Sequence, residues 1–137
     1  MRSRAQKGFR DSFRQLLMTI SFLSVGLPAR VAANASSLKL APEALHFAKQ
    51  AVNSASAPQT VAVTNPGSVP VSLYQIISSG VDFKQTNDCP SSLGPAASCS
   101  ISVTFQPAIE GAREGAVIIF SSDDISPHTI VVAGVGE

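Results

Sequence analysis

The chain has 137 residues, of which 45% are apolar and 14% are charged. This composition excludes a disordered or strongly solvated chain, and the length favours one domain. The formal net charge is +1, but it is unevenly distributed: residues 1–35 carry six cations against one acid, and residues 36–137 carry four cations against eight acids. The basic residues therefore belong to the N-terminal segment, and nothing resembles a nucleic-acid-binding surface.

Residues 1–35 have the layout of a secretory signal peptide. A basic segment precedes the apolar run Leu16–Leu27, and Ala33-Asn34-Ala35 fits the small-x-small pattern of signal peptidase. The alternative is an uncleaved anchor, but the run is shorter than the ~20 apolar residues that cross a bilayer. We expect a helical signal peptide that meets the membrane only transiently, and a mature domain over 36–137 that is secreted, periplasmic or on the cell surface.

The mature segment begins with short strand patterns separated by turn signals. A first edge strand over 38–47 is interrupted by Pro42, and a second strand covers 59–65. The sequence Asn65-Pro66-Gly67-Ser68 predicts a tight turn in which glycine supplies a positive φ.

The next strand, over 69–77, keeps Ile76 on its apolar face only if a bulge shifts the parity after Tyr74. A short strand then contains Val81 and Phe83.

The clearest strand follows the second cysteine. Cys99, Ile101, Val103 and Phe105 point to one side, and the serine and threonine residues between them point to the other. Two strands complete the chain, over 114–121 and 129–135. The first of these two is apolar on both faces, which is typical of a central strand or one covered on both sides.

About seven short strands, with turn signals every dozen or so residues and no helical period after the leader, predict an all-β fold. The expected architecture is an antiparallel β-sandwich of the immunoglobulin type. Its core should contain the inward side chains of these strands, namely Val61, Val63, Leu73, Phe83, Ile101, Val103, Phe105, Val117, Ile119, Ile130 and Val132.

Cys89 and Cys99 are the only cysteines, and they bracket a loop of proline, serine, glycine and alanine. A secreted domain with two cysteines usually forms a disulfide. A redox pair is disfavoured because the spacing is not CxxC, and a metal site would have only His46 and His128 to add. The bridge would fix Pro90–Ser98 at one end of the sandwich. We therefore predict a rigid, exposed contact loop there, formed by Pro90, Ser91, Ser92, Leu93, Gly94 and Pro95.

No enzyme motif is present. The serines are not framed by GxSxG or SxxK, and Glu110 and Glu114 do not form a credible glycosidase pair. We expect both histidines near the edges of outer strands. Asp123 and Asp124 are expected in a solvated turn, with a weak calcium site as the alternative. No catalytic residue, metal or cofactor is expected.

Several phrases, in this order, resemble one family. They are LKLAPEALHF, TVAVTNPGSVPVSL, SGVDFKQTNDCPSSLGPAASCSISVTFQP, EGAREGAVIIFSSD and HTIVVAGVGE. From Leu38 to Gly136 the chain resembles the Ig-like domains of the ASPM–SPD-2–Hydin (ASH) group, most closely the bacterial secreted relatives often labelled choice-of-anchor D. The resemblance implies a seven-stranded, major-sperm-protein-like sandwich that serves in binding or as a structural spacer, without catalysis.

We therefore expect a non-catalytic exported Ig-like domain that acts as a structural or protein-interaction module, with an unknown protein partner or cell-surface component. The alternative is a small carbohydrate-binding module. Such modules usually present a row of exposed aromatic side chains. Here the chain has no Trp, and only Tyr74 and Phe120 are candidates for outward aromatic positions.

Overall fold

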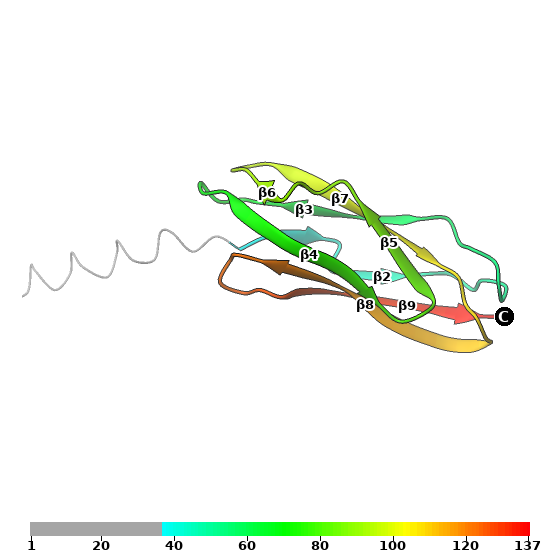
Figure 1. Ribbon diagram of the computed structural model, residues 1–137. Helices are drawn as coiled ribbons and strands as arrows, with labels where there is room; N and C mark the ends of the chain where they lie inside the picture. Colours follow the sequence, from blue (N-terminus) through cyan, green and yellow to red (C-terminus); the bar gives the residue numbers. More distant parts are fainter. Residues whose placement is uncertain (1–36) are drawn as a thin grey trace, which may run out of the picture. The chain divides into compact units, whose positions relative to one another are not determined.

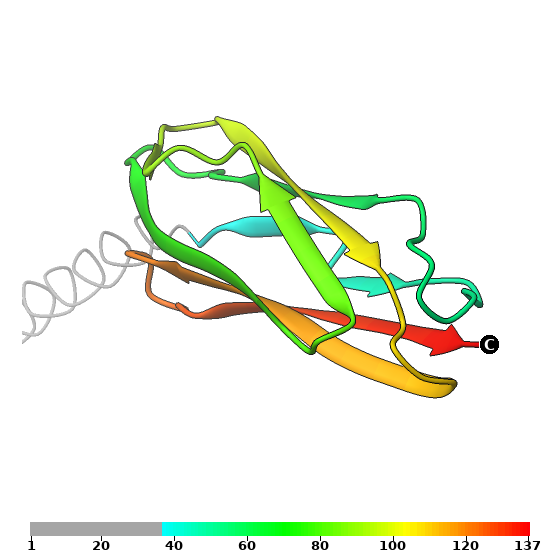
Figure 2. The same ribbon diagram turned by 45° about the vertical axis from the view of Figure 1, so that its right-hand side comes forward.

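The computed structural model describes residues 37–137, and the predicted signal peptide lies outside the described residues. The described part contains nine β-strands in two sheets. The sheets lie face to face and enclose one apolar core (Figures 1 and 2). Within residues 37–137, no helical segment has the length and apolar character that crossing a bilayer requires.

The first sheet is antiparallel and has the strand order β1-β3-β7-β5. Its strands are β1 (Lys39–Ala41), β3 (Gln59–Thr64), β5 (Phe83–Asn87) and β7 (Ser98–Phe105). The second sheet has the order β2-β9-β8-β4-β6. Its strands are β2 (Ala44–His46), β4 (Val71–Ser79), β6 (Ser92–Leu93), β8 (Gly111–Ser121) and β9 (His128–Gly136). In this sheet β2 runs parallel to β9, and the other pairs are antiparallel.

The first predicted strand is divided between the two sheets, which corrects the sequence-based assignment of one edge strand. β1 pairs with β3 in the first sheet, and β2 pairs with β9 in the second. Pro42 lies between the two pieces. Proline has no backbone N–H to donate to a ladder, so the chain leaves one sheet there and joins the other.

The predicted core is confirmed. All eleven side chains predicted to point inward are buried, with at most 9% of their surface exposed. Phe105 lies at the centre, with ring centroids 4.9 Å from Phe83 and 5.7 Å from Phe47. Its ring lies against the backbone of Gly134, where an added Cβ would come within 2.6 Å of the ring. Alternation along the strands therefore identified the buried face correctly.

The predicted bulge is also present, because the register between β4 and β8 shifts between Leu73 and Gln75. After the shift, Ile76 packs against the core, as the alternation requires. The assignment of Val81 to a strand is wrong. Val81 is 83% exposed, and β5 starts at Phe83.

Candidate interaction surface

The predicted disulfide between Cys89 and Cys99 is formed, and the two Cα atoms are 5.0 Å apart. Cys89 follows β5, and Cys99 lies on the buried face of β7. Asp88 lies close to both sulfur atoms, but cysteines in a disulfide offer no thiolate to a metal. The Asp88 carboxylate instead accepts a hydrogen bond from the backbone N–H of Ser100, at 2.6 Å. This group of side chains therefore fixes the loop and does not form a metal site.

The loop between the cysteines crosses from the first sheet to the second. Ser92 and Leu93 form β6, which pairs with Ser72 and Val71 at the start of β4. The Leu93 side chain is only 1% exposed and belongs to the core, so its predicted role as a contact residue is wrong. A lone leucine among proline, serine and alanine was the available signal for such an anchor, because its apolar side chain gains most from burial.

Asn65 holds this loop from the opposite side and is completely buried. Its amide nitrogen donates to the carbonyl oxygens of Val69 and Leu93, and its side-chain oxygen accepts from the N–H of Gly67. Its backbone exchanges two further hydrogen bonds with Ala96 and Ala97. One side chain thus organises the 65–69 turn and joins it to the cysteine loop.

The 65–68 turn was predicted, but its mechanism differs from the prediction. The glycines with positive φ in the described residues are Gly80 and Gly111, so Gly67 does not supply the turn geometry. The Asn65 side chain does so instead, by mimicking a backbone hydrogen bond two residues ahead.

The remaining predicted contact residues face solvent. Pro90, Ser91, Ser92 and Pro95 are exposed, and Gly94 is half-buried. We call residues 90–98 the clamped loop. Its start borders a depression of about 260 Å³ that is also lined by Tyr74 and Asn87. Tyr74 is 70% exposed, so an aromatic ring stands beside the exposed prolines and serines of the loop.

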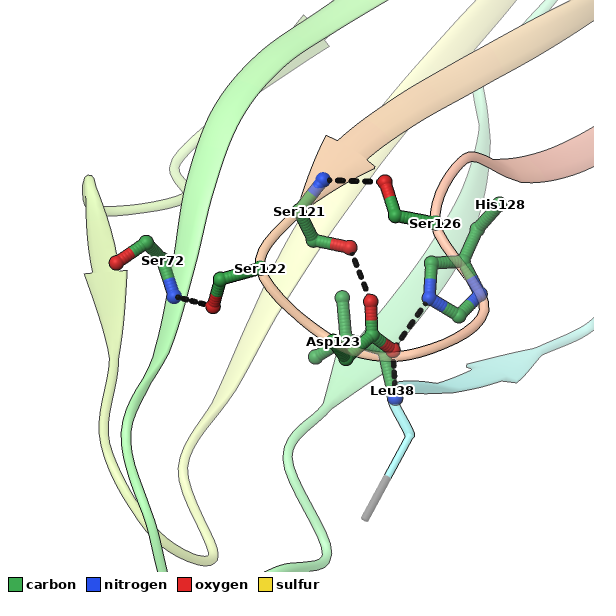
Figure 3. Close-up of polar contacts among 7 residues, drawn as sticks. All are labelled: Leu38, Ser72, Ser121, Ser122, Asp123, Ser126 and His128. Carbon is green, nitrogen blue, oxygen red and sulfur yellow. Dashed lines mark hydrogen bonds and ion pairs between the residues drawn. The ribbon is translucent and has the colours of Figure 1, made fainter. Parts of the chain in front are cut away.

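A second polar cluster lies at the β8–β9 turn (Figure 3) and was missed by the sequence analysis. The Asp123 side chain is 1% exposed, which contradicts its expected solvated position, whereas Asp124 is exposed as expected. Its carboxylate accepts hydrogen bonds from the Ser121 hydroxyl, from the Leu38 backbone N–H at 2.9 Å and from His128 Nε2 at 2.7 Å. His128 is itself buried, so its predicted edge position is wrong as well, whereas His46 lies on the edge strand β2 as expected.

The pattern of hydrogen bonds indicates a structural role for this cluster, because Asp123 is the common acceptor. Ser121 and His128 both bond to Asp123 and not to each other, so the arrangement lacks the serine–histidine contact that activates a nucleophile. Burial raises the pKa of Asp123, but the hydrogen bonds from Ser121, Leu38 and His128 outweigh it and hold this pKa below its ordinary value. The ionised carboxylate therefore fastens the start of the described chain to the second sheet.

A buried ion pair performs a similar task at Asp82, which is 3% exposed. Its carboxylate accepts from the backbone N–H of Ala108 at 2.8 Å and from Nε of Arg113. Burial raises the pKa of Asp82. The hydrogen bond from Ala108 and the hydrogen bond and positive charge of Arg113 lower this pKa by more, so the net shift is downward. This pair links the entry of β5 to the 106–113 turn and to β8.

A scan of protein-family models finds no match to this chain, and a search of curated proteins finds none either. Solved structures do match. A protein of unknown function from Porphyromonas gingivalis W83 superposes with a TM-score of 0.63 at 16% identity, over 80% of this chain and 50% of that one. The chain thus spans half the length of that protein.

Two other solved structures are matched over nearly their whole length. The ASH/PapD-like domain 7 of human CEP192 superposes with a TM-score of 0.59 at 14% identity, over 75% of this chain and 87% of that one. WR4, an MSP family member of C. elegans, gives a TM-score of 0.50 at 10% identity, over 74% of this chain and 99% of that one. The described part of the chain therefore has the ASH- and MSP-like immunoglobulin fold.

Proposed function

We propose that the protein is an exported, non-catalytic interaction module that meets a protein partner, at the cell surface or in the periplasm, through the clamped loop and Tyr74. The ASH- and MSP-like fold supports a non-catalytic interaction module. The leader pattern supports export, and the disulfide is consistent with it because such bonds persist mainly in oxidising compartments.

One observation carries the proposal: the clamped loop is exposed but fixed at several points. The disulfide restrains both of its ends, Leu93 anchors it in the core, and Asn65 bonds to the carbonyl oxygens of Leu93 and Ala97. A loop that is ordered before binding loses less conformational entropy when it meets a partner. Binding residues are also commonly found on loops held by a rigid scaffold.

Tyr74 adds the contact chemistry that the loop itself lacks. Prolines and serines give shape and hydrogen bonds, whereas an exposed tyrosine offers a large apolar surface and one hydroxyl group. Tyrosine is enriched at the energetic centres of protein interfaces. The same depression is lined by Tyr74 and by the start of the loop, at Cys89, Pro90 and Ser91. A partner that buries the Tyr74 ring would therefore contact the clamped loop at the same time.

The test is site-specific photo-cross-linking in cells that export the protein. A photoreactive residue replaces Ser91 in the loop, and a matched variant carries it at Thr60, which is exposed on the outward face of β3. We expect a discrete protein adduct from position 91 and none from position 60. Equal labelling from both positions, or no adduct from position 91, would contradict the proposed contact site.

A further inference from the structure

The disulfide that closes the clamped loop is unequally exposed at its two ends. Cys99 is 6% exposed on the inward face of β7, whereas Cys89 is half-buried and lines the depression beside Tyr74. A disulfide opens when a thiolate attacks one of its sulfur atoms, so access decides which sulfur reacts. The accessible end of this bond is therefore Cys89.

Asp88 places a negative charge beside the bond. One of its carboxylate oxygens and the two sulfur atoms all lie within 4.8 Å of one another. The backbone N–H of Asp88 donates to the Ser100 carbonyl oxygen at 3.2 Å, and its carboxylate accepts from the Ser100 N–H at 2.6 Å. These two hydrogen bonds hold the carboxylate in position, although Asp88 is exposed.

The charge of Asp88 is not neutralised by an ion pair. Three ion pairs occur within residues 37–137, and none of them includes Asp88. The depression that Cys89 borders is lined by uncharged side chains. An aspartate side chain carries a full negative charge at neutral pH, so Asp88 sets the charge beside the sulfur atoms.

We propose that Asp88 makes the Cys89–Cys99 bond selective among small thiols, by repelling anionic thiols more strongly than cationic ones. In the first step a thiolate attacks Cys89 Sγ and forms a mixed disulfide there. The S–S bond breaks, its electron pair goes to Cys99 Sγ, and that sulfur takes a proton from water. A second thiolate then attacks the sulfur of the bound small thiol, which releases Cys89 as a protonated thiol. The protein disulfide is reduced by two electrons, and the two small thiols are oxidised to their disulfide.

Both negative charges of the first step lie close to Asp88. The attacking thiolate brings one to Cys89, and the departing sulfur of Cys99 carries one in a buried position. Like charges about 5 Å apart repel more strongly at a protein surface than in bulk water. A carboxylate on the thiol adds to this repulsion, whereas an ammonium group offsets it. The bridge is therefore most resistant to anionic thiols, whether or not the clamped loop binds a partner.

The experiment measures how fast the purified, oxidised protein in its exported form is reduced by mercaptopropionate, an anionic thiol, and by cysteamine, a cationic one. An alkylating reagent stops the reaction, and mass spectrometry counts the free cysteines. Asp88→Asn removes the charge but keeps an oxygen that can accept from the Ser100 N–H. At low ionic strength this variant should be reduced about fivefold faster or more by mercaptopropionate, and less than about twofold faster by cysteamine. Each thiol is compared with itself, so differences in thiol pKa cancel.

Glu110→Gln is the matched control, because it removes one exposed carboxylate beyond the far end of β7. It should change either rate by less than about twofold, since the length of β7 exceeds the Debye length of about 10 Å at 0.1 M salt. In about 1 M salt, the effect of Asp88→Asn on mercaptopropionate should also fall below about twofold. Thermal melts confirm that each variant is folded before its rates are interpreted.

Equal acceleration of both thiols by Asp88→Asn would overturn the proposal, because a loosened loop and not a lost charge would explain it. An unchanged rate with mercaptopropionate would overturn it as well. Partly reduced protein gives an independent readout of the point of attack. The small thiol should be found on Cys89 and the alkyl group on Cys99, and the reverse distribution would contradict the assigned step.

Discussion

Phe105→Ala tests the packing at the centre of the sandwich. The Phe105 ring is 0% exposed, stacks on Phe83 with centroids 4.9 Å apart, and lies against the backbone of Gly134. Truncation removes the ring and leaves a cavity, because the Gly134 backbone belongs to a paired strand and cannot collapse into the space. Buried Phe→Ala changes cost about 3–5 kcal/mol.

That loss compares with a total stability of about 5–15 kcal/mol for a domain. Near the melting midpoint of a domain of about 100 residues, each kcal/mol shifts Tm by about 4–8 °C. We therefore expect Tm to fall by about 12 °C or more in differential scanning calorimetry, or the variant to be unfolded at room temperature.

The matched control is Phe120→Ala, the same truncation at a half-buried outward position of β8. Phe120→Ala should lower the free energy of unfolding by less than half as much as Phe105→Ala, because less of its ring is buried. If Tm is unchanged in Phe105→Ala, or if the two variants lose the same amount, the strand register and the packing argument are wrong.

Three further predictions concern the leader, the disulfide and the buried aspartate. Exported protein should lack residues 1–35, and N-terminal sequencing that finds Met1 in it would refute cleavage. Thiol titration of denatured, unreduced protein should find no free cysteine; reduction should lower the free energy of unfolding by roughly 2–3 kcal/mol, because opening a loop of sequence separation 10 restores chain entropy to the unfolded state. Asp123 has a lowered folded-state pKa. Its contribution to stability is therefore complete above the unfolded pKa of about 3.9 and is lost as the pH falls below it. Urea melts at a series of pH values should show a shallower acid decline for Asp123→Asn than for wild type, with the remaining slope carried in part by Asp82; identical slopes would show that the carboxylate is not held as described.

The sequence predicted those features that depend on alternation along one strand. The inward set on β3, β7, β8 and β9 follows from period-two patterning, and so does the need for a bulge near Tyr74. The number and spacing of the strands predicted an immunoglobulin-type sandwich, and the resemblance to ASH domains added its major-sperm-protein-like form; the solved structures confirm that fold.

The polar anchors could not be predicted in the same way. Asn65, Asp82 and Asp123 all occur in turns or at strand ends, where polar residues usually meet solvent. Their burial depends on partners far away in the chain, such as Arg113 for Asp82 and the Leu38 N–H for Asp123. No local pattern links such pairs.

The candidate site was predicted only in part, again because burial depends on contacts between distant segments of the chain. The two cysteines and the exposure of Pro90, Ser91, Ser92 and Pro95 followed from spacing and composition. The burial of Leu93 was missed: its apolar side chain was a signal, but the pairing with Val71 that places it in the core links segments far apart in the chain. Pairing between distant segments sets which residue of a loop becomes an anchor and which become contacts.

The central claim is that the clamped loop is ordered before any partner binds, and amide hydrogen exchange on the free, oxidised protein tests it most directly. The N–H groups of Ala96, Ala97 and Ser100 donate to Asn65, Gly94 and Asp88. The account predicts that these amides exchange slowly, with protection close to that of the β7 ladder. Asn65→Ala removes the side-chain hydrogen bonds to Val69, Leu93 and Gly67 but keeps the backbone acceptors of Ala96 and Ala97. It should therefore lower the protection at Ala96 and Ala97 while the disulfide remains. Exchange of these amides at the rate of an unfolded chain in the wild-type protein would contradict the claim.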